Sequence, residues 1–264
     1  MESNKVNNSF TQIKNNFLSL FETTTYNNIA TRKGIALKTI LLLCVTAITS
    51  MFFYPILKPV ILKNPNINAI CFSMIALGFI NYGIYSAGLK QVEISKACGL
   101  IYSFIEGIIL SIIFVVLNLV YANLVEIAFM AIFATFIVFV AMSHAYYKGF
   151  IKVTNRFRQI MLYCSFSLAV SYIVRLVLSL CGIWTIENII YNSFLTLPIS
   201  LIMLGFVFMF LALHFDYTEQ MIKQGMPKKY EWQVSLAFAT TLIEIFLRIM
   251  LILLRLFGKD QERK

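Results

Sequence analysis

Charged residues are scarce in this chain: they make up 13% of its 264 residues, whereas 59% are hydrophobic. A soluble domain of this length does not bury enough of its residues to tolerate that composition, so an ordinary soluble protein is excluded. The HExxH, GxSxG and CxxC patterns of zinc hydrolases, serine hydrolases and redox or metal proteins are absent. His144 and His214 have no metal-ligand partner at a useful spacing. We therefore predict neither an enzyme nor a bound cofactor.

Long apolar runs dominate what is present. A transmembrane helix needs about 20 apolar residues, and the runs are too long, and alternate too little, for membrane strands. Backbone groups inside lipid must bond to one another, so each run predicts a helix. This gives an all-α integral membrane protein with a polar tail (1–34), a seven-helix membrane domain (35–258) and a charged tail (259–264). The seven runs are 36–57, 67–88, 97–121, 124–146, 159–183, 188–214 and 232–257.

Basic residues concentrate on one side of the predicted membrane. They lie in the N-terminal tail and after the second, fourth and sixth runs, whereas the opposite side has Lys58 and Lys63. The positive-inside rule therefore places the N-terminus in the cytoplasm. The net charge of +10 does not indicate nucleic-acid binding, because these residues form no patch with base-stacking aromatics. The basic C-terminal tail disagrees with this topology, since seven spans would place it outside.

Four charged residues lie deep within the predicted spans, away from their ends. A charge at the bilayer centre costs about 2.5–3.5 kcal/mol on insertion scales, so such residues face the bundle interior, water or one another. Glu106 lies in the third run and Arg175 in the fifth. Glu244 and Arg248, in the seventh, have the i, i+4 spacing of an ion pair on one helix face. Arg175 is a candidate partner for either glutamate.

The densest group of charges stands between the last two runs. Asp216 follows the sixth run directly, and Glu219 comes one helical turn later. A carboxylate at the end of an apolar helix can bind a cation or titrate with pH. The motif Pro-Lys-Lys-Tyr-Glu-Trp, residues 227–232, then leads into the seventh run and contributes Lys228, Lys229 and Glu231.

These motifs resemble the Bax inhibitor-1 (transmembrane Bax-inhibitor-motif, TMBIM) family in its bacterial branch. The resemblance covers residues 30–258, and its most specific element is the motif at 227–232, placed after six spans. The further matching segments are residues 38–43, 106–107, 151–158, 177–182, 215–216 and 219–220.

The resemblance implies seven helices, the last enclosed by the other six, and a pH-sensitive calcium leak. Carboxylates on the last two helices would share a proton and close the pore, as is expected of two acids in a low dielectric. Asp216 matches the sixth-helix aspartate. Its partner is Thr241 when counted from Trp232, or Glu244 when counted back from the end of the last run. Asp216 and Glu244 are accordingly the predicted gate and calcium ligands.

Other features of the chain keep a second reading open. Glu106 would be a pore or packing acid. Arg175 and Arg248 depart from the family pattern, and such cations repel calcium unless they are paired. The alternative is a non-transporting regulator that binds other membrane proteins, such as a membrane protease complex, through the basic loops 148–158 and 223–229. In either case we expect a monomer. We expect it to lie in the lipid bilayer of the bacterial cytoplasmic (inner) membrane.

Overall fold

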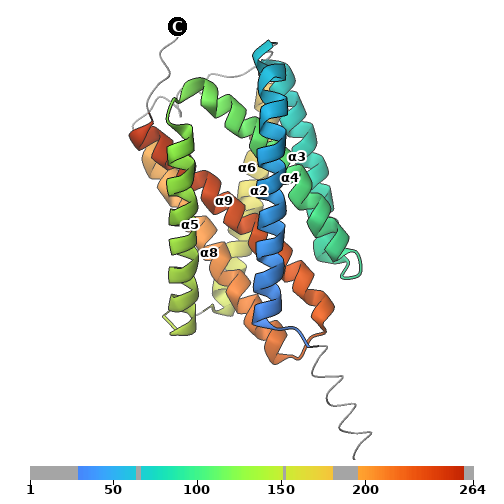
Figure 1. The fold of residues 1–264 in the computed structure, drawn as a ribbon. Helices are drawn as coiled ribbons and strands as arrows, with labels where there is room; N and C mark the ends of the chain where they lie inside the picture. The colour runs from blue at the N-terminus through green and yellow to red at the C-terminus, as the bar shows by residue number, and fades with distance from the viewer. Residues whose placement is uncertain (1–28, 64–66, 151–152, 181–195, 259–264) are drawn as a thin grey trace, which may run out of the picture.

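The computed structural model describes residues 29–63, 67–150, 153–180 and 196–258 (Figure 1). This part of the chain forms seven long α-helices and a short 3-10 helix, without a β-strand. The expected all-α membrane fold is therefore confirmed. The elements are α2 (Arg32–Lys63), α3 (Ile67–Lys90), α4 (Ser95–Val120), α5 (Leu124–Tyr147), α6 (Asn155–Leu180), α8 (Thr196–Lys223), η1 (Lys228–Tyr230) and α9 (Glu231–Phe257).

Six of these helices are long and apolar enough to cross a membrane: α2, α3, α4, α5, α8 and α9. The fifth predicted span corresponds to α6, which has 26 residues but is more polar, with Arg156, Arg158 and Arg175 along it. Large apolar side chains cover the outside of the bundle; Phe72, Phe133 and Phe166, for example, are exposed. In a bilayer these side chains face lipid, which explains why so much apolar surface is left uncovered by protein.

Several helices continue beyond their apolar runs. The first reaches Lys63 and passes through Pro55 and Pro59, which transmembrane helices tolerate because neighbouring groups satisfy the released backbone. The sixth run continues as α8 to Lys223. Glu219 therefore lies inside a helix and not in the loop that the sequence predicted, and Asp216 lies two turns before the helix ends.

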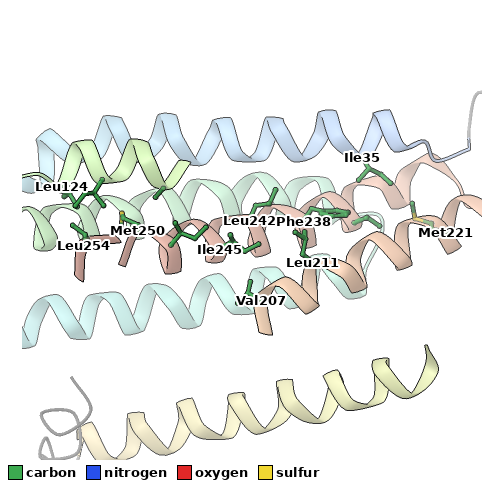
Figure 2. Close-up of a cluster of buried hydrophobic side chains, with 14 of the residues drawn as sticks. Ile35, Leu124, Val207, Leu211, Met221, Phe238, Leu242, Ile245, Met250 and Leu254 are labelled. Atoms are coloured by element: carbon green, nitrogen blue, oxygen red, sulfur yellow. The ribbon is translucent and has the colours of Figure 1, made fainter. Parts of the chain in front are cut away.

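The last helix forms the centre of the bundle. α9 packs against α2, α3, α4, α5 and α8, while α6 packs on α8. Buried residues occur on every side of its first half, from Gln233 to Ile243. Its apolar side chains, including Phe238, Ile245 and Met250, form one cluster with Leu124 and Leu211 of the surrounding helices (Figure 2). The last helix is thus central as predicted, with five of the other six helices packed against it and α6 packed on α8.

Small residues bring α2 and α4 close together. A Cβ atom at Gly107 would lie 2.6 Å from the Cβ of Thr49 and 2.7 Å from the backbone oxygen of Thr46. Gly99, two turns earlier, leaves more room, since its Cβ would be 3.4 Å from Leu42. Close backbone approach at small residues is a common way to pack helices in membranes. It fixes α4, which carries Glu106, against the rest of the bundle.

Candidate functional site

The connection between α8 and α9 begins with a tight helix end. Gly225 has φ +62°, its N–H donates to the oxygen of Ile222 (3.0 Å), and the N–H of Met226 donates to Met221 (3.1 Å). This pair of bonds is the Schellman motif, in which the left-handed residue is usually glycine. The chain reverses there, and Pro227 starts the turn that leads into α9.

The segment that leads into the first turn of α2 is attached to this connection. We call residues 29–34 the N-terminal strap. Ile29 and Pro227 form an isolated antiparallel bridge, and the N–H of Ala30 donates to the oxygen of Met226 at 2.9 Å. Residues nearly 200 positions apart therefore meet at one end of the bundle, where the basic loops also lie.

Glu231 is the acid at which this attachment converges. Its carboxylate is fully buried and accepts bonds from the N–H (2.7 Å) and hydroxyl (3.2 Å) of Thr31 and from Nζ of Lys38 (2.5 Å). Thr31 also caps α2, because its hydroxyl accepts the N–H of Gly34 at 3.0 Å. A Cβ on Gly34 would lie 2.4 Å from the carboxylate, so a larger residue there would displace the carboxylate from its donors. Glu231 therefore joins α2 to the start of α9.

The other residues predicted for this loop lie at its surface or in the adjoining helix. Glu219, in α8, pairs with Arg32 of the strap at 2.6 Å. Lys229 pairs with Glu93, from the connection between α3 and α4, at 2.5 Å. Lys228 lies in the same 3-10 turn and is exposed. These contacts tie three connections together at one end of the bundle.

Asp216 lies among α5, α6 and α8. Its side chain is 14% exposed and contacts the guanidinium of Arg158. Gln220 Nε2 donates to the same carboxylate oxygen at 2.7 Å, and the hydroxyl of Tyr146 lies 3.4 Å from the other. A single partly buried carboxylate thus holds a residue from each of two neighbouring helices.

Asp216 and Glu244 have separate partners among the described side chains, so the predicted carboxylate gate stays a prediction. The pair expected between Glu244 and Arg248 is present, at 2.6 Å. Thr241, the other candidate partner, contacts His214 Nε2 at 2.8 Å. His214 and Asp216 are two residues apart, about 200° around a helix. Because His214 faces α9, Asp216 points away from α9, towards α5 and α6.

A second polar group lies inside the membrane-spanning region. Asn81 of α3 donates from Nδ2 to Glu106 of α4 at 2.5 Å, and the hydroxyl of Tyr102 lies close to both Glu106 and Thr240 of α9. We call these four residues the Glu106 cluster. Glu244 is within electrostatic range of its carboxylate. The side chain of Arg175, the partner considered for either glutamate, lies outside the described residues.

No group of three or more His, Cys, Asp and Glu side chains able to hold a metal occurs in the described part of the chain. The two predicted calcium ligands, Asp216 and Glu244, have separate partners. The carboxylates are instead engaged with arginine, lysine or neutral donors. Any calcium site at Asp216 would need Arg158 to move away first.

A family model described as Bax inhibitor 1 like matches residues 3–258. The chain belongs to the Bax inhibitor 1 like family. This confirms the resemblance drawn from the motifs. As a member of this family with several long apolar helices, it is an integral membrane protein that contacts the lipid bilayer. Comparisons with curated proteins and with solved structures give no match.

Two contacts at the candidate site of this Bax inhibitor 1 like protein were not predicted from its sequence. Arg158 lies in a matched segment, but nothing in the residue spacing links it to Asp216 across 58 positions. Asn81 is one polar residue in an apolar run. Its position in the middle of a span, about as deep as Glu106 in the next helix, is the signal that would have identified the pair.

Proposed function

We propose that this protein is a pH-sensitive cation leak for calcium, controlled by the contact between Asp216 and Arg158. The supporting observation is that Asp216 joins α8 to α6 through Arg158 and to α5 through Tyr146. Losing one partner of a partly buried pair leaves the other charge uncompensated, which disfavours the packed arrangement. Such a contact is a suitable latch between a closed and an open bundle.

The latch depends on charge. The carboxylate of Asp216 attracts the guanidinium of Arg158, and neutralising that carboxylate removes the attraction and biases the helices towards separation. The proposed leak is therefore larger when this charge is absent. A carboxylate that Arg158 has released also offers the oxygen ligands that calcium prefers.

The experiment compares calcium flux into liposomes that contain the purified protein at about pH 6 and about pH 8. We expect the native protein to conduct more at the lower pH. Asp216→Asn removes the charge but keeps the shape, so its flux at the higher pH should rise to the acidic level. Glu219→Gln is the matched control, because Glu219 lies one turn away in α8 and pairs with Arg32 at the surface; its pH response should stay native.

Two results would refute the latch. The first is an Asp216→Asn variant that keeps the native pH response. The second is a native protein with no flux above empty liposomes, which would favour a regulator of other membrane proteins acting through its basic loops. In either role we propose a monomer in the bacterial cytoplasmic membrane, with the strap and the basic loops on the cytoplasmic side.

A further inference from the structure

The Glu106 cluster contains a buried oxygen without a donor. Asn81 is 3% exposed, and its Nδ2 bonds to Glu106. Its Oδ1 has no hydrogen-bond partner among the described residues. Because the two atoms share one carbon, turning the amide exchanges their places and brings this oxygen to the carboxylate. An unpartnered buried acceptor destabilises a fold by about 1–3 kcal/mol, and a bilayer supplies no water to relieve it.

The neighbouring groups have no hydrogen to spare for this oxygen. Thr240 uses its one hydroxyl hydrogen on the backbone oxygen of Leu236, at 2.8 Å. Tyr102 also has one hydroxyl hydrogen, and it contacts both Glu106 and Thr240. The backbone N–H groups of the surrounding helices are used within those helices. When Glu106 is ionised, oxygen lone pairs therefore outnumber hydrogens in the cluster.

The charges near Glu106 also indicate that a positive partner is lacking in the described part of the chain. Two carboxylates, Glu106 and Glu244, lie within electrostatic range of each other. One cation, Arg248, pairs with Glu244 at 2.6 Å. Tyr85 of α3 is the further titratable group near Glu244, and it is neutral unless deprotonated. Among the described side chains, ionised Glu106 leaves one negative charge in excess inside the membrane.

We propose that the Glu106 cluster binds one small monovalent cation of the size of Na⁺. Glu106 supplies the charge, and Asn81, Tyr102 and Thr240 supply neutral oxygens, with the amide of Asn81 turned so that Oδ1 faces the ion. Hard oxygen donors suit such a cation. One carboxylate and one monovalent ion form a neutral complex, whereas a divalent ion would leave an uncompensated charge in lipid. The site is separate from the proposed calcium latch, because it uses α3, α4 and α9.

A chemical protection experiment tests this site directly. Dicyclohexylcarbodiimide adds to protonated carboxyl groups in apolar surroundings, and mass spectrometry locates the adduct. In choline chloride, Glu106 is empty of metal ions and should be labelled, whereas Glu106→Gln should lose that adduct. Sodium chloride should slow the labelling about tenfold once sodium reaches about ten times its dissociation constant.

Two substitutions separate a cation site from packing. Asn81→Ala removes the unpartnered oxygen, so Glu106 should still be labelled but lose its protection by sodium. Ser103→Ala is the matched control: Ser103 is fully buried on α4, and its hydroxyl also lacks a hydrogen-bond partner among the described residues. Its removal should leave sodium protection native.

Three outcomes would overturn the proposal. They are equal labelling in sodium and choline, as expected if a proton or a water fills the cluster; no labelling of Glu106 in choline; and calcium protecting as well as sodium. Each is measured without any flux assay, so failure here is distinct from failure of the calcium latch.

Discussion

The buried carboxylate of Glu231 offers the strongest test of how this fold is held together. Glu231→Gln keeps the shape of the side chain but removes its charge and turns one acceptor into a donor. Lys38, whose side chain is 18% exposed, would then face an amide. Removing one partner of a buried pair costs about 3–5 kcal/mol. Lys38 keeps some exposure and the Trp232 ring, 5.2 Å from Nζ, so we expect a loss of about 2–3 kcal/mol.

A double-mutant cycle isolates the interaction. The unfolding free energy is measured for Glu231→Gln, Lys38→Met and the double variant by titrating mixed micelles with a denaturing detergent. Because the two side chains touch at 2.5 Å, the double variant should lose less than the sum of the single losses, by about 1–3 kcal/mol. Glu219→Gln breaks a more exposed pair and should cost less than about 1 kcal/mol. Additive losses at Glu231 and Lys38 would refute the reasoning.

Two further predictions concern packing and can be read from the same titration. Gly107→Ala should destabilise the protein by about 1–3 kcal/mol, because its Cβ would meet the Cβ of Thr49 at 2.6 Å. Gly99→Ala is its control, because the nearest side-chain atom there would be 3.4 Å away. Equal losses for the two variants would contradict the close approach of α2 and α4. Thr241→Val keeps the side-chain volume but removes the hydroxyl that bonds His214 at 2.8 Å, so the unfolding free energy should fall by about 1–3 kcal/mol. An unchanged midpoint of the detergent titration would show that His214 finds another partner.

The helices were predictable because their signal is local. A span is set by the length of an apolar run, and the runs from 67–88 and 124–146 end within a few residues of α3 and α5. The ends are less predictable where a helix continues through polar residues. α8 does so because its stop is the glycine turn at Gly225 and not the end of the apolar run. Asp216 was therefore expected beside a loop but lies within a helix.

The partners of the charged residues were less predictable from the sequence, because they depend on how the helices are rotated in the bundle. Spacing alone gave the pair Glu244–Arg248, since both residues are on one helix. The family resemblance implied that Asp216 faces α9, but that depends on which side of α8 packs there. His214 occupies that side and Asp216 the opposite one. A match to a family motif does not determine the direction in which a side chain points from its helix when the residues around it differ.

The difference between satisfied and unsatisfied polar groups is a guide to function in this protein. Glu231 and Asp216 have strong donors, so they stabilise one arrangement, and changing it requires a proton or a competing ion. Asn81 is different. The unpartnered serine hydroxyls on α4 can rotate to donate to a carbonyl of their own helix, but an amide oxygen can only accept. Neither the described helices nor lipid offer the oxygen of Asn81 a hydrogen. The cation that we propose at Glu106 would give this oxygen a partner and would explain why the fold retains it.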